Sequence, residues 1–190
     1  MADQLFLSYR LRGYTESNML RHYEKMLRRF PFSKLSKTGS TLTVYGVSWD
    51  EPALFEGQFA DPPDVDAVLA AAREFATADC SVQLETWWDL WRYDKDWKVE
   101  PTRVALHCFG PAFESVEDDH LRIDFGVDAI FLPQPDVPES AKLVQSNIRS
   151  LLHLAEDLDS VLLVERKRLW TESGENFAEQ VRWAVNELED

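Results

Sequence analysis

Alternation of apolar and polar residues predicts a three-stranded antiparallel meander over residues 80–127. In its first part, even positions such as Val82 and Leu84 are apolar, whereas most odd positions are polar or aromatic. This period of two is typical of a strand with one buried face. A turn centred near residue 94 or 95 keeps the next strand in the same phase, and a second turn near residue 114 leads into a third strand. We therefore expect one face of this sheet to be core and the other to be a polar and aromatic surface.

Helical spacing and β-branched runs predict the remaining elements. Strands are expected at residues 4–11 and 41–47, and helices over 19–30, 65–78 and 139–158, with a last helix after Ser173 and Gly174. Residues 49–63 are expected to form a long loop. The apolar run 161–164 fits either a strand or a continuation of the preceding helix, and we favour the strand.

These elements predict the fold class. We expect one α+β domain over residues 1–190, with an antiparallel or mixed sheet of five to six strands and about four helices packed mainly on one side. The expected order is β-α-β-α-β-β-β-α-β-α. A chain of this length buries enough apolar surface to fold without disulfides.

The net charge of −14 bears on the kind of partner. Nucleic-acid binding needs basic side chains to replace counterions along the phosphates, so we expect no nucleic-acid partner. Residues 1–40 nevertheless hold eight basic and three acidic side chains, which leaves −19 on the rest of the chain. Two interpretations stay open: the basic first helix lies against an acidic part of the same molecule, or it forms a patch for an anionic ligand.

Several kinds of site and of cellular location are disfavoured by the sequence. No apolar run approaches the roughly eighteen residues that span a bilayer, and the N-terminus does not resemble a secretory leader, so we expect no membrane association and a cytoplasmic location. Cys80 and Cys108 have no metal-ligand spacing, and the four histidines are scattered. No glycine-rich phosphate loop or familiar catalytic motif is present. We therefore predict no cofactor and no metal site, and we assign no catalytic residue.

The candidate binding residues lie on the polar and aromatic face of the predicted meander. In the expected register, Glu85 lies opposite or diagonal to Arg103, and His107 lies close to Arg122 and Asp124. Aromatic rings beside carboxylates and a histidine suit a sugar, a base or a peptide, because rings supply stacking area and polar groups supply orientation. The alternative is a solvated sheet face whose charges pair across strands and whose tryptophans are covered. The candidate residues are Glu85, Trp87, Asp89, Trp91, Arg103, His107, Arg122 and Asp124.

Two hypotheses about function follow. The first is a non-catalytic acidic protein-binding domain, such as an immunity or antitoxin-like partner that docks on a basic protein, and it rests on size, charge and the missing catalytic motifs. The alternative is a small-molecule enzyme or ligand-binding domain that uses the polar and aromatic sheet face. The sequence favours a protein that is not an enzyme.

Overall fold

A computed structural model describes residues 3–115 and 118–173 together with residues 177, 179 and 181. Seven strands form one sheet in the order β3-β2-β4-β5-β6-β1-β7, and every neighbouring pair is antiparallel. The strands are β1 (Gln4–Leu11), β2 (Ser40–Gly46), β3 (Phe55–Phe59), β4 (Cys80–Asp94), β5 (Asp96–Phe109), β6 (Leu121–Val127) and β7 (Val164–Thr171).

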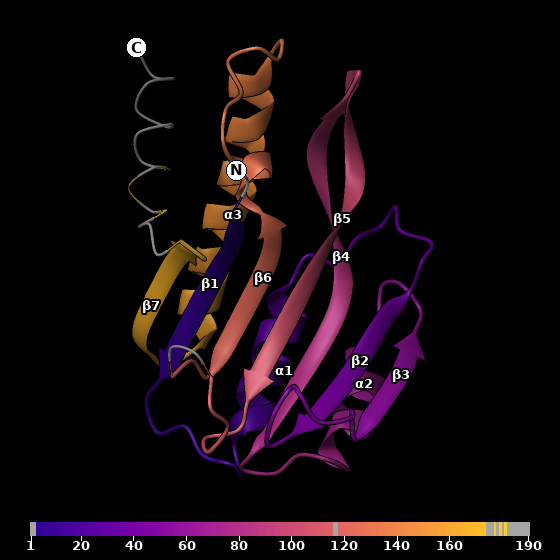
Figure 1. Ribbon diagram of the computed structural model, residues 1–190, viewed down its shortest axis with the longest axis vertical. Coiled ribbons are helices and arrows are strands. Elements are labelled where there is room, and N and C mark those ends of the chain that lie inside the picture. Colours follow the sequence, from indigo (N-terminus) through magenta and orange to yellow (C-terminus); the bar gives the residue numbers. More distant parts are fainter. Residues whose placement is uncertain (1–2, 116–117, 174–176, 178, 180, 182–190) are drawn as a thin grey trace.

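The α-helices of the described residues lie on one face of the sheet. Figure 1 looks onto the opposite face, with α1 (Met19–Arg29), α2 (Val65–Arg73) and α3 (Ser140–Val161) behind the strands. A short 3-10 helix, Asp128–Phe131, follows β6. The α+β class is confirmed, and so is the packing of helices on one side.

The numbers of elements differ from the prediction. The sheet has seven strands instead of five to six, and the described residues contain three α-helices instead of about four. The additional strand is β3, which lies inside the expected loop 49–63. Its five residues give too short an alternation to recognise, and its centre is Gly57, where a side chain would collide with the ring of Phe55. Most of the predicted helix after Ser173 lies outside the described residues, and its described positions 177, 179 and 181 are helical.

The end of α3 also corrects the prediction. The run 161–164 is neither wholly strand nor wholly helix, because α3 continues to Val161 and β7 begins at Val164. Leu162 is extended, and its N–H closes the helix by donating to the carbonyl of Leu158. The following strand then pairs with β1.

The core lies between the sheet and the helices. The strand positions that the alternation pattern predicts to be buried face this core. The even positions from 80 to 90 in β4 and from 102 to 108 in β5, and the odd positions from 121 to 125 in β6, are buried against the helices. The β4–β5 turn is centred on Lys95, which takes a positive φ of 67° while Asp94 pairs with Asp96. The turn near residue 94 or 95 is therefore confirmed. The central core residues include Leu7, Tyr23, Met26, Val82, Leu84, Leu106, Ile123, Ile148 and Leu151.

The basic face of α1 is partly neutralised within the molecule. Arg28 forms ion pairs with Glu24 on its own helix, at 2.8 Å, and with Asp66 on α2, at 2.5 Å. Both pairs are largely exposed, so each contributes at most about 1 kcal/mol. For Arg28, this geometry supports the interpretation in which α1 lies against an acidic part of the same chain.

None of the helices in the described residues is both long enough and apolar enough to cross a membrane.

Candidate functional site

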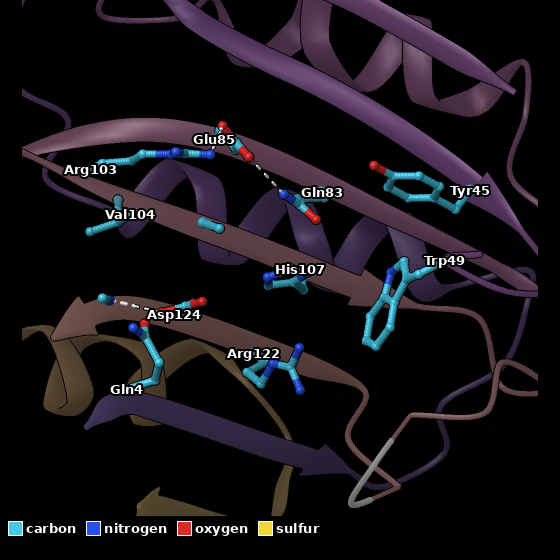
Figure 2. A pocket seen from close by; sticks show the side chains of 12 residues that line it. Gln4, Tyr45, Trp49, Gln83, Glu85, Arg103, Val104, His107, Arg122 and Asp124 are labelled. Carbon is cyan, nitrogen blue, oxygen red and sulfur yellow. Dashed lines mark hydrogen bonds and ion pairs between the residues drawn. The ribbon is translucent and has the colours of Figure 1, made fainter. Parts of the chain in front are cut away.

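A pocket of about 520 Å³ lies on the face of the sheet opposite the helices. Side chains from β1, β2, β4, β5 and β6 line it, together with Trp49 from the segment after β2 (Figure 2). Its volume is within the usual range for sites that hold a small molecule. The lining residues are Gln4, Tyr45, Trp49, Gln83, Glu85, Arg103, Val104, Ala105, His107, Arg122, Asp124 and Gly126.

The strand register creates the hollow of this pocket. Ala105 of β5 pairs with Glu85 of β4 on one side and with Asp124 of β6 on the other. Because neighbouring strands lie about 4.8 Å apart, the backbones at Glu85 and Asp124 are roughly 10 Å apart, with only a methyl group between them. In the next row across the sheet, His107 lies between Gln83 and Arg122.

Glu85 and Arg103 form an ion pair at one edge of the pocket. The register is diagonal, as expected, and Arg103 Nη2 lies 2.5 Å from Glu85 Oε2. Gln83 Nε2 donates to the other carboxylate oxygen of Glu85 at 3.1 Å (Figure 2). The carboxylate of Glu85 is therefore already engaged by two neighbours.

Arg122 is a buried cation in the centre of the sheet face. The residue is 8% exposed, and its Cζ lies 5.2 Å, 5.7 Å and 5.2 Å from the ring centroids of Phe6, Trp49 and Phe109. Among the described residues, its Nε has no hydrogen-bond partner and no carboxylate lies within ion-pair distance of its guanidinium. Burial lowers the pKa of Arg122, whereas Asp119 and Asp124 attract its charge from farther away.

His107 is the neighbour of Arg122 on β5. The residue is 5% exposed, its ring stacks on Phe109 at 5.6 Å, and its Nδ1 has no hydrogen-bond partner among the described residues. Burial, together with a smaller effect of the charge of Arg122, lowers the pKa of His107 to about 3. The imidazole is therefore neutral near pH 7, with one nitrogen that donates and one that accepts.

Asp124 is the second charged group on β6 that faces the pocket. Its Oδ1 accepts a hydrogen bond from the Gly126 N–H at 2.8 Å. Burial raises the pKa of Asp124, while this hydrogen bond and the more distant charge of Arg122 oppose the effect. Throughout residues 3–115 and 118–173, no basic side chain lies within ion-pair distance of it.

Three of the eight residues predicted for this surface lie outside the pocket. Beyond Thr41 and Glu85, β2 no longer pairs with β4, and residues 30–39 pack beside β4 instead. Trp87 Nε1 donates to the Gly39 carbonyl at 2.9 Å, and the carboxylate of Asp89 accepts from the hydroxyl of Ser33 and from a backbone N–H.

The third is Trp91, whose backbone N–H and carbonyl are both bonded by the side chain of Asn147 on α3. The contacts of Trp87, Asp89 and Trp91 therefore connect β4 to other parts of the fold. The structure brings together the other five predicted residues: Glu85, Arg103, His107, Arg122 and Asp124.

Four pocket residues with polar or aromatic side chains were not predicted from the sequence: Gln4, Tyr45, Trp49 and Gln83. Tyr45 and Gln83 have the correct strand parity, so extending the alternation rule to them would have found them. No pattern indicates Trp49, which lies in an irregular segment and is 38% exposed. Its Nε1 donates to Ser81 Oγ at 3.3 Å, which holds the ring beside Arg122.

The site is chemically suited to bind a polar molecule of modest size. It presents a desolvated guanidinium, a neutral imidazole and a carboxylate with one backbone donor. No group of three or more histidine, cysteine, aspartate or glutamate side chains in the described residues is placed to hold a metal ion. Comparison of this chain with protein-family models, with curated proteins and with solved structures found no match.

Proposed function

We propose that this protein is a ligand-binding domain, and that its site is the pocket on the sheet face opposite the helices. The observation that carries this proposal is the pair Arg122 and His107, which are more than nine-tenths buried and each have a ring or guanidinium nitrogen without a partner among the described residues. A buried polar group without a hydrogen bond costs about 1–3 kcal/mol, and a buried charge costs more. A ligand that supplies the missing partners offsets that cost.

The chemistry of the pocket favours binding over catalysis. A general base works best when its pKa lies near the working pH, and burial has moved the pKa of His107 to about 3. The imidazole is therefore a weak base that serves as a hydrogen-bonding group. Glu85 is held by Arg103 and Gln83, which makes it a fixed part of the wall.

Filling the pocket tests the proposal. Ala105→Leu places a larger side chain between Glu85 and Asp124 without changing any charged or hydrogen-bonding side chain. The protein is screened against small organic acids, amines, amino acids and sugars by thermal shift and by tryptophan fluorescence. We expect at least one compound to bind saturably to the unmodified protein and to lose about tenfold or more in affinity with Ala105→Leu.

The matched control is Ala70→Leu, the same substitution at an exposed position of α2. It is expected to leave binding unchanged. Trp49→Phe identifies the site, because Trp49 lines the pocket and its loss should remove most of the fluorescence response. If every compound that binds does so equally well with and without Ala105→Leu, the pocket is not the site and the proposal fails.

Docking of a basic protein, the other hypothesis from the sequence, stays a prediction that rests on the net charge of −14. An acidic surface attracts a basic partner less strongly as the salt concentration rises, because the salt screens the charges. Affinity purification at low and at high ionic strength tests this hypothesis. Recovery of the chain without any partner at low salt would count against it.

A further inference from the structure

We infer that the ligand of the pocket is a small zwitterion, whose acid group pairs with Arg122 and whose amino group pairs with Asp124. This inference rests on the proposed binding function and names the class of ligand. It starts from the difference between two sets of charges in the same pocket. Glu85 and Arg103 form a closed ion pair, whereas Arg122 and Asp124 have no ion-pair partner among the described residues.

The surroundings of Arg122 favour the binding of an anion. Three aromatic rings surround the guanidinium, and cation–π contacts of this kind contribute less than a direct carboxylate pair. Its planar fork of N–H donors matches the two oxygens of a carboxylate or of a phosphate. The adjacent neutral His107 adds one more donor on the same row of the sheet.

The surroundings of Asp124 favour the binding of a cation or of a hydrogen-bond donor. One of its oxygens accepts from Gly126, and the carboxylate faces the pocket opposite Glu85 across Ala105 (Figure 2). A carboxylate has room for about four hydrogen bonds. No basic side chain among the described residues forms an ion pair with Asp124. An ammonium group on the ligand would supply that positive charge.

The spacing fits one molecule that bridges both groups. Arg122 and Asp124 lie two residues apart on the same face of β6, which separates their Cα atoms by about 7 Å. No ion pair joins the two side chains, so their charges remain available at opposite ends of a short ligand. A four-carbon amino acid whose acid and amino groups are separated by about three methylenes spans a comparable length, and the pocket volume of about 520 Å³ accommodates it.

Three probes with the same four-carbon skeleton test the class of ligand: 4-aminobutanoate, butanoate and butylammonium. Each is titrated into the full chain by calorimetry at pH 7. We expect 4-aminobutanoate to bind at least about tenfold more tightly than either probe with a single charge, because it gains a second charge-assisted hydrogen bond. Equal affinity for butanoate and 4-aminobutanoate would overturn the inference, and so would the failure of all three probes to bind.

A matched pair of variants tests whether the amino group of the ligand binds at Asp124. Asp124→Asn keeps an oxygen for the Gly126 N–H and removes the charge. It should abolish the tenfold advantage of 4-aminobutanoate while leaving butanoate binding within about twofold. Glu56→Gln, on the exposed part of the same sheet face, should leave the advantage intact. A retained advantage in Asp124→Asn would overturn the assignment.

The two proposals fail in different ways. If none of the three probes binds but another compound from the screen loses affinity with Ala105→Leu, the pocket binds a ligand of another class. If no compound is sensitive to Ala105→Leu, the binding function itself is wrong.

Discussion

Arg122 and Asp124 face the same pocket from the same strand, two residues apart, and no ion pair joins them. The neighbouring pair Glu85 and Arg103 is closed at 2.5 Å, in a more exposed place where an ion pair is worth little. The more buried charges are thus the ones without a close counter-charge among the described residues. That distribution is unfavourable for stability alone, and it is the reason for our proposal that Arg122 and Asp124 bind a ligand.

Removing the charge of Arg122 should therefore abolish ligand binding without lowering the stability of the fold. Arg122→Met keeps a long side chain among Phe6, Trp49 and Phe109 and removes the buried cation. Burying a charge without a partner is costly, so an apolar residue of similar volume in its place should be neutral or stabilising. We expect the free energy of unfolding in urea to stay equal or to rise by about 1 kcal/mol, whereas binding of any acid-bearing ligand is lost.

Arg103→Met serves as the control for that substitution. It breaks an exposed pair and should change the free energy of unfolding by less than about 1 kcal/mol. A destabilisation of about 3 kcal/mol or more in Arg122→Met would contradict the interpretation, because that magnitude is typical of breaking an established buried pair.

Asp89 should behave as a structural residue. Its carboxylate accepts from the hydroxyl of Ser33 and from the Lys34 N–H at 2.8 Å, and so fixes residues 33–36 beside β4. Asp89→Ala is expected to lower the free energy of unfolding by about 1–3 kcal/mol, since two hydrogen bonds to a charged group are lost. Ligand affinity at the pocket should change by less than twofold, as measured by calorimetry. A large loss of ligand affinity with an unchanged free energy of unfolding would show that Asp89 takes part in binding.

The sequence predicts the inner part of the fold better than its connections. Alternation is strict where a strand has one buried face, so the meander and its turn at Lys95 follow from the parity of residues such as Val82 and Leu84. The same rule places Glu85, Arg103, His107, Arg122 and Asp124 on one surface. It also places Trp87, Asp89 and Trp91 there, because parity gives the face of a residue and says nothing about which loop covers it.

The remaining features depend on contacts between distant segments. Asn147 lies in a helix with a clear apolar stripe, yet it is 1% exposed and bonds the main chain of both Trp91 and Ile130. Trp49 reaches the pocket from an irregular segment. Neither position has a local pattern that indicates its role, since each depends on how segments far apart in the sequence pack together.

Asn147 provides a further test of these long-range contacts. Its Oδ1 accepts from the Trp91 N–H at 2.9 Å, and its Nδ2 donates to the carbonyls of Trp91 and Ile130 at 2.8 and 2.9 Å. Asn147→Ala leaves three backbone groups without these partners, so we expect the free energy of unfolding to fall by about 3 kcal/mol or more. Ser150→Ala, on the exposed side of α3, should change it by less than about 0.5 kcal/mol. A comparable effect of both substitutions would show that water replaces the Asn147 contacts.

Stability should decline as the pH falls below about 6.5, and His120 should contribute to that decline. Its Nδ1 accepts from the Leu11 N–H at 2.9 Å, and its ring stacks on Tyr14 at 4.1 Å. Burial, with a smaller effect of the charge of Arg10, lowers the pKa of His120 to about 4, although the carboxylate of Glu165 opposes the shift. The unfolded chain, in which this histidine titrates near 6.5, binds the proton more readily than the folded chain does. Stability from His120 is therefore complete above pH 6.5 and is lost progressively down to about pH 4.

The variant His120→Asn isolates this contribution. An asparagine oxygen can accept from the Leu11 N–H, but it does not titrate. Because His120 is partly exposed, we expect an effect on the order of 1–2 kcal/mol: the unmodified protein should lose that much more stability between pH 7 and pH 4.5 than the variant does, in urea unfolding. Ser150→Ala, at an exposed serine of α3 that does not titrate, should leave the pH dependence unchanged. If His120→Asn loses as much stability on acidification as the unmodified chain, protonation of the other buried histidines or of carboxylates accounts for the decline, and His120 is protonated in the folded state without cost.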